Sequence, residues 1–367
     1  MRLGVARAVI EDRILDGDVV VEEGVVTEAG VAPAGRGGLG APGLIDLQVN
    51  GFAGIDFLSA TAADYTTAGV ALAATGVTAY QPTFISSPLG RYEESLGVVT
   101  GLPEAPGGPR LLGVHLEGPF LSPEWAGAHN PDNLLDPDPD LALRLCGMGP
   151  VTYMTVAPEL PGGLELVARL VEHGIVVACG HTDADAGEAH AAFDAGATAI
   201  THIYNAHRRW SPRDPGVAGV ALVRPDVTVQ AIADLVHLAP ESVYAACLAT
   251  GGRFAIVTDA MMAAGMKDGS YQLGDRTITV ASGEARTADG ALAGSVSTMD
   301  RSIRNLVSLG APLEQALAAA SRSPAKVIGR EDLGRLSLGV PADIVVLDDS
   351  LNVVRTLVAG REVYAAR

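Results

Sequence analysis

The chain alternates short apolar runs with longer stretches in which apolar residues recur at helical spacing. Helical stretches at 64–75, 164–173, 186–195 and 242–250 lie between several of the apolar runs. This alternation is typical of parallel βα units, and eight such units predict an α/β protein with a (β/α)8 TIM barrel over residues 42–334. The predicted strands are residues 44–48, 77–81, 111–116, 151–157, 175–180, 197–202, 227–233 and 254–259.

Both ends of the chain carry shorter β-rich runs, at 3–10, 17–26 and 342–364. Neither end is long enough to form a stable sheet by itself. We therefore expect the two ends to pair as a small β-sandwich, with residues 1–41 as its first part and residues 335–367 as its second.

Composition narrows the class of protein. The formal net charge of −18 over 367 residues opposes binding to nucleic acid or to an anionic membrane. No apolar run approaches the ~20 residues of a spanning helix, and the first residues lack the apolar core of a signal peptide. Cys146, Cys179 and Cys247 lie far apart, without a CxxC pair. We therefore expect a reducing, cytoplasmic setting and neither nucleic acid nor membrane as a partner.

Residues able to bind a metal or transfer a proton stand where several predicted strands end: Glu117, His181, His202, His237 and Asp259. Taken singly, each is typical of a helix cap or of a hydrogen-bonded structural residue. In a barrel, however, the carboxyl ends of all strands meet at one mouth. The joint placement therefore favours a functional site, and the long loop 118–140 after the third strand is typical of a lid.

One carboxylate and two imidazoles form a set suited to a divalent metal with an open water position. Glu117, His181 and His202 supply this set. A metal in such a site lowers the pKa of its water and polarises a carbonyl oxygen, and Asp259 is placed to take a proton and return it. The pattern predicts metal-assisted amide hydrolysis.

Long irregular motifs from about residue 42 to 348 resemble, in unchanged order, the N-acetylglucosamine-6-phosphate deacetylases of the amidohydrolase superfamily. The resemblance implies a metal-dependent (β/α)8 barrel with a β-sandwich from both termini. It also implies hydrolysis of N-acetylglucosamine 6-phosphate to glucosamine 6-phosphate and acetate. The motifs are PGLIDLQVNGF, HLEGPF followed by GAHNP, GHTDA, THIYNA, IADLVH, VTDAM, LAGS and PADIVVLD.

The resemblance also implies residue roles, a cofactor and an oligomer. Glu117, His181 and His202 resemble the metal ligands, and Asp259 resembles the catalytic acid/base. We expect one divalent ion per chain, zinc first, with iron, manganese or cobalt as alternatives, an amino sugar phosphate as substrate, and a homodimer. The implied substrate contacts are Ala128 and His129 on the lid, Asn205 by side chain, Ala206 by backbone N–H, Arg213 and His237 at the phosphate, and Leu292, Ala293 and Gly294 along the sugar.

Two positions depart from the usual pattern. Gln48 stands where many amidohydrolases carry His-x-His, and a neutral amide is a poor ligand for a second cation, so we predict one ion and not two. Asp46 lies one layer deeper and is expected to orient a ligand or Gln48. His207 replaces the methionine usual in the family, and either a pocket wall or a spare ligand fits it. With a single ion, His129 is our candidate to help polarise the carbonyl.

Three other functions are alternatives to this one. The nearest is the same reaction on N-acetylgalactosamine 6-phosphate, which differs only at the C4 hydroxyl. A cyclic-amide hydrolase of the dihydroorotase type would want His-x-His and often a modified lysine, but Lys267 and Lys326 lie at no predicted strand end. A non-catalytic sugar-phosphate sensor is the alternative from a different class, although this chain retains the full set of ligands and base.

Overall fold

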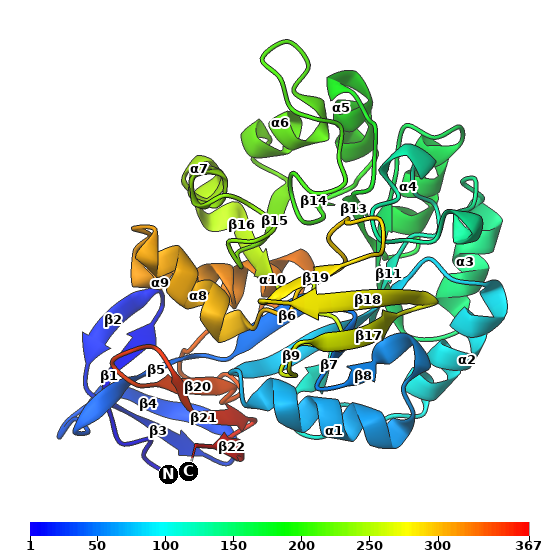
Figure 1. The fold of residues 1–367 in the computed structure, drawn as a ribbon. Coiled ribbons are helices and arrows are strands. Elements are labelled where there is room, and N and C mark those ends of the chain that lie inside the picture. The colour runs from blue at the N-terminus through cyan, green and yellow to red at the C-terminus, as the bar shows by residue number, and fades with distance from the viewer. Residues whose placement is uncertain (367) are drawn as a thin grey trace.

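A barrel of parallel strands forms the centre of the chain in this computed structural model, which describes residues 1–366 (Figure 1). All eight predicted strands are present and pair in parallel with their neighbours. The last strand joins the first because the backbone N–H of Asp259 donates to the carbonyl oxygen of Gln48 (2.9 Å) and Val49 bridges to Ala260. In ring order the strands are β6 (Leu44–Val49), β9 (Val77–Ile85), β11 (Val114–Glu117), β12 (Val151–Val156), β13 (Val176–Cys179), β14 (Ala199–Ile200), β15 (Thr228–Ile232) and β16 (Phe254–Val257).

Helices connect the barrel strands and surround them (Figure 1). The first begins at a capping box, in which Thr61 and Asp64 each accept a hydrogen bond from the other's backbone N–H. In the described part of the chain, no helix is long and apolar enough to cross a membrane. The helices, which include the four predicted, are α1 (Ala62–Ala73), α2 (Leu89–Thr100), α3 (Pro139–Gly147), α4 (Gly163–Glu172), α5 (Ala186–Asp194), α6 (Gly216–Val223), α7 (Pro240–Thr250), α8 (Met299–Ser308), α9 (Leu313–Ala319) and α10 (Arg322–Val327).

The two ends of the chain form the expected β-sandwich, and the termini lie side by side in Figure 1. A six-stranded sheet contains strands from both ends and packs on a hairpin, with Val19, Val21, Ile344 and Leu357 in the shared core. Gly43 joins this unit to the barrel at a close approach, since a Cβ there would lie 2.2 Å from the hydroxyl of Thr78. The sheet order is β2 (Arg13–Asp16), β1 (Val5–Ile10), β5 (Gly37–Pro42), β20 (Ile344–Leu347), β21 (Val353–Val358) and β22 (Arg361–Ala365), and the hairpin is β3 (Asp18–Glu22) with β4 (Val25–Val31).

A three-stranded antiparallel sheet follows the last barrel strand, and we made no prediction for it. It consists of β17 (Gly269–Leu273), β18 (Arg276–Ala281) and β19 (Glu284–Arg286). It contacts the long loop after β11, because the Arg276 guanidinium donates to the carbonyl of His129 (3.2 Å) and the Asn130 amide to Asp275 (2.6 Å). This sheet and the loop together cover the barrel mouth.

Candidate active site

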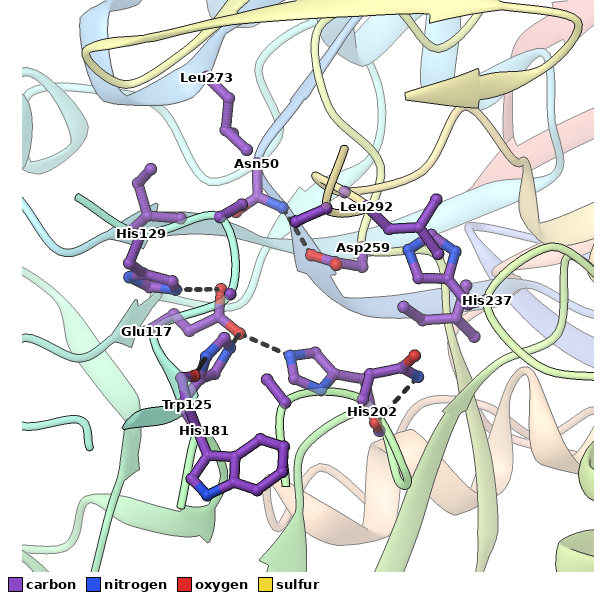
Figure 2. A pocket seen from close by; sticks show the side chains of 18 of the residues that line it. Asn50, Glu117, Trp125, His129, His181, His202, His237, Asp259, Leu273 and Leu292 are labelled. Carbon is purple, nitrogen blue, oxygen red and sulfur yellow. Dashed lines mark hydrogen bonds and ion pairs between the residues drawn. The ribbon is translucent and has the colours of Figure 1, made fainter. Parts of the chain in front are cut away.

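A cavity of about 380 Å³ opens at the carboxyl ends of the barrel strands (Figure 2). Glu117 is the last residue of β11, whereas His181, His202 and Asp259 each stand two residues beyond the end of β13, β14 and β16. All predicted site residues line the cavity except Arg213 and Ala293. Those from the loops are Ala128, His129, Asn205, Ala206, His237, Leu292 and Gly294.

The backbone at three of these strand ends is strained. His181 (φ 50°), His202 (φ 27°) and Asp259 (φ 50°) all lie at positive φ, which residues other than glycine rarely adopt. Such strain persists where the surrounding structure determines it, and it is concentrated at functional sites. The positive φ shared by His181, His202 and Asp259 therefore supports a common functional role for these three residues.

Glu117 is the centre of the polar network. Its Oε1 lies 2.9 Å from His202 Nε2 and 3.2 Å from His181 Nε2, and its Oε2 lies 3.5 Å from His129 Nε2. The side-chain amide of Gln48 also donates to Oε1 (2.8 Å). Burial favours the neutral acid, but the hydrogen bonds from the three imidazoles outweigh it and hold the pKa of Glu117 well below its usual range.

The donor chemistry of this network fits a divalent metal ion. The ligand atoms of Glu117, His129 and His181 all lie within 4.8 Å of one another, and all three residues are buried. Carboxylate and imidazole donors together are typical of zinc sites. We predicted His202 in this set and His129 on the lid. His129 belongs to this group, and His202 approaches the same carboxylate more closely (2.9 Å against 3.5 Å), so the role of each as a ligand stays a prediction.

Asp259 faces Glu117 across the side chain of Gln48. Its Oδ1 accepts hydrogen bonds from the amides of Asn50 (2.7 Å) and Gln48 (3.2 Å), whereas Oδ2 accepts none from residues 1–366. Burial and the nearby charge of Glu117 raise the pKa of Asp259 to about 6. A carboxylate held by one oxygen, with a pKa near neutrality, is suited to accept and return a proton.

His237 lines the opposite side of the cavity from His129 (Figure 2). Its Nδ1 lies 2.8 Å from Asp234 Oδ2, and its backbone N–H donates to Oδ1 of the same carboxylate (2.9 Å). Asp234 therefore fixes the orientation of the ring, because it holds both the ring and the backbone of His237. The second ring nitrogen, Nε2, has no hydrogen-bond partner among residues 1–366 and can contact a ligand.

Comparison with known proteins identifies the family. Residues 41–363 match the amidohydrolase family model. The chain belongs to the amidohydrolase family. It is 39% identical over 343 residues to the N-acetylglucosamine-6-phosphate deacetylase of Bos taurus, with 88% of this chain and 83% of that protein covered. It is 33% identical over 325 residues to an N-acetylgalactosamine-6-phosphate deacetylase of Escherichia coli O157:H7, with 87% and 86% covered.

A solved structure shows the same architecture. The N-acetyl-D-glucosamine-6-phosphate deacetylase of Mycobacterium smegmatis, a variant in complex with N-acetyl-D-glucosamine-6-phosphate, superposes with a TM-score of 0.93 at 34% sequence identity. The match covers 100% of this amidohydrolase and 99% of that chain. Barrel and β-sandwich are therefore both features of the shared fold.

Sequence reasoning missed several residues that line the cavity of this amidohydrolase, among them Asn50, Trp125 and Arg209. Asn50 could have been found, because it stands two residues beyond Gln48 at the end of the first barrel strand. The backbone carbonyl of Trp125 bonds Nδ1 of His181 (2.9 Å), a contact that no side-chain pattern reveals. Only the path of the loop brings Arg209 to the cavity.

The phosphate-binding arginine is the least supported of the predicted contacts. Arg213 is exposed. It lines neither the active-site cavity nor a second cavity of about 540 Å³ that lies beside it. Arg209 lines both cavities together with His237, and it forms no ion pair or hydrogen bond with the described residues. The neighbouring Arg208 is paired with Asp183 (2.9 Å) and Asp214 (2.8 Å) instead. Within one chain, Arg209 is the cation better placed for an anionic group.

Two further predicted positions lie behind the cavity surface. Ala293 is fully buried, and its backbone N–H donates to the carbonyl of Ala285 (3.0 Å), so it supports Leu292 and Gly294 instead of lining the cavity. His207 is buried beside His202 and forms part of the wall of a second cavity of about 540 Å³. The structure places His207 as a wall residue outside the compact Glu117 group.

Proposed function

We propose that this amidohydrolase removes the N-acetyl group of N-acetylglucosamine 6-phosphate, giving glucosamine 6-phosphate and acetate. The observation that carries the proposal is the placement of Asp259 in the same cavity as the Glu117–histidine network, with one carboxylate oxygen free. Relatives that carry this activity in their names cover most of the chain and support the choice of substrate.

The residues of the site have different roles in amide hydrolysis. A divalent ion held by Glu117 and the neighbouring histidines, zinc first among the candidates, would polarise the acetamide carbonyl and lower the pKa of a bound water. Asp259 accepts the proton of the attacking water at Oδ2 and returns it to the nitrogen of the leaving amine. Asn50 and Gln48 hold Oδ1, so that the other oxygen keeps its orientation throughout.

The phosphate end of the substrate would lie toward His237. A phosphate needs hydrogen-bond donors and positive charge, and Arg209 and the backbone N–H of Ala206 are available there. Arg213 is exposed away from this cavity, so its predicted role requires a second subunit to bring it to the site. This agrees with the homodimer expected from the sequence, which sedimentation of the active enzyme would test. The cytoplasmic location also stays a prediction.

Acetate release tests the proposed function. We would compare N-acetylglucosamine 6-phosphate, N-acetylgalactosamine 6-phosphate and unphosphorylated N-acetylglucosamine, each with and without a chelator. We expect metal-dependent release that is fastest on the first substrate. Faster release from the galacto isomer would establish the alternative that the Escherichia coli relative represents. Release from none of them would favour a sugar-phosphate sensor.

A further inference from the structure

The three histidines that face Glu117 differ in how their second ring nitrogen is held. All three point Nε2 at the carboxylate, which leaves Nδ1 on the far side of each ring. Nδ1 of His181 bonds the carbonyl of Trp125 (2.9 Å), and Nδ1 of His129 bonds the hydroxyl of Ser86 (2.9 Å). Nδ1 of His202 is buried and has no partner among residues 1–366.

This difference bears on metal binding. A histidine that ligates a metal almost always donates its other ring N–H to a carboxylate, a carbonyl or a water, and this bond fixes the ring and its tautomer. His181 satisfies the rule through the carbonyl of Trp125, and Nδ1 of His129 is held by Ser86, whose backbone N–H donates to it (3.2 Å). His202 therefore needs a partner that the rest of its surroundings must supply.

His207 lies beside His202 and is itself unsatisfied. The two rings stack with centroids 5.9 Å apart and an angle of 29° between their planes. His207 is 2% exposed, and neither of its ring nitrogens has a hydrogen-bond partner in the described chain. Two unpaired nitrogens on a buried side chain are costly, because a buried polar group without a partner loses the hydrogen bonds it had in water.

The backbone holds His207 in this position. Thr182 donates from its N–H to the carbonyl of Ala206 (3.2 Å), and its own carbonyl accepts from the N–H of Arg208 (2.9 Å). His207 is thus clamped between two bonds to the residue that follows His181. The position of its ring is set by the same backbone that positions the Glu117 network.

We propose that His207 is a positioning residue for His202, joined to it through one buried water. The water accepts the Nδ1–H of His202 and donates to a ring nitrogen of His207. The ring centroids lie 5.9 Å apart and no direct hydrogen bond joins the two rings, and a bridging water can span such a gap. His207 also forms part of the wall of the second cavity.

The inference rests on the metal-dependent function proposed above, with His202 among the ligands. Removing the outer partner of a metal-bound histidine typically costs 10- to 100-fold in metal affinity. We therefore expect His207→Met, which fills the space without an acceptor, to weaken zinc binding by roughly that factor. His207→Gln keeps an acceptor and should recover part of the loss.

Zinc affinity is measured on metal-depleted full-length protein by competition with a chromophoric chelator, beside thermal unfolding of the same metal-free samples. His190→Met on the exposed face of α5 is the matched control and should bind zinc as the wild type does. Weaker zinc binding in His207→Met, partial recovery in His207→Gln and similar unfolding temperatures of the metal-free proteins would support the inference.

Three outcomes would overturn it: wild-type zinc affinity in His207→Met, equal weakening in both variants, or a loss of affinity that merely follows a lower unfolding temperature. Wild-type protein that takes up no zinc would overturn the metal-dependent function as well. Because affinity is measured without substrate, a protein that responds as expected but releases no acetate would contradict the proposed reaction and leave the role of His207 standing.

Discussion

Asp46 is a fully buried carboxylate beneath the active site, and it should make the stability of this enzyme depend on pH. It accepts hydrogen bonds from the hydroxyl (2.5 Å) and the N–H (3.2 Å) of Thr258 and from the N–H of Gln48 (3.3 Å). These bonds hold the backbone at Gln48 and the strand end before Asp259, and the predicted role of Asp46 in orienting Gln48 or a ligand stays a prediction. Burial outweighs these bonds and raises the pKa of Asp46 from 3.8 to about 7.

The direction of the effect follows from proton linkage. Between these two pKa values the folded protein binds a proton that the unfolded chain has released, so the stability contributed by Asp46 is lost as the pH rises through 7. Relative to a pH well below both pKa values, Asp46 lowers the free energy of unfolding by about 2 kcal/mol at a pH of about 5.5 and by about 4 kcal/mol at a pH of about 8.5. Asp46→Asn stays uncharged. Its free energy of unfolding should therefore rise relative to that of the wild type by about 2 kcal/mol between the lower and the higher pH, so the variant gains relative stability at the higher pH.

Urea unfolding followed by circular dichroism at the two pH values measures this difference. Asp136→Asn removes an exposed carboxylate instead and should leave the pH dependence as it is in the wild type. Parallel stability curves for the wild type and Asp46→Asn would refute the reasoning, since they would mean that Asp46 binds protons equally in the folded and unfolded states.

The remaining predictions concern the reaction and the metal. Asp259→Asn should lower kcat by about 10²- to 10⁴-fold with zinc content retained, and a variant that loses zinc would identify Asp259 as a ligand. Arg209→Ala should raise KM for the phosphorylated substrate while leaving release from unphosphorylated N-acetylglucosamine unchanged; equal effects on both would place Arg209 outside the phosphate site. Elemental analysis after chelation and titration with metal should give one divalent ion per chain. A stoichiometry near two, with activity that needs both ions, would show that Gln48 does not prevent a second ion from binding.

The sequence predicted the barrel and the strand-end residues because both follow from local pattern. Apolar runs separated by helical stretches define parallel strands, and the carboxyl ends of those strands meet at one edge. Glu117, His181, His202 and Asp259 could therefore be placed in one cavity without coordinates.

The parts that could not be predicted depend on the path of loops. Arg209 and Arg213 lie four residues apart in one polar segment, and nothing local distinguishes the one that reaches the cavity. His129 lies twelve residues beyond Glu117, on a loop whose return to the metal group is fixed by contacts with the sheet β17–β19. The pattern of βα units ends at the eighth strand and therefore does not reveal that sheet.

The join between the first and last barrel strands has a consequence for how the enzyme is made. Gln48 and Asp259 stand 211 residues apart in the chain, yet one bonds the other, and β5 from the amino end pairs with β20 near the carboxyl end. A ribosome must therefore release the chain past residue 259 before the acid/base acquires its neighbours, and past residue 347 before β5 pairs with β20. A product that ends between His202 and Asp259 contains Glu117 and its histidines but lacks the proton acceptor.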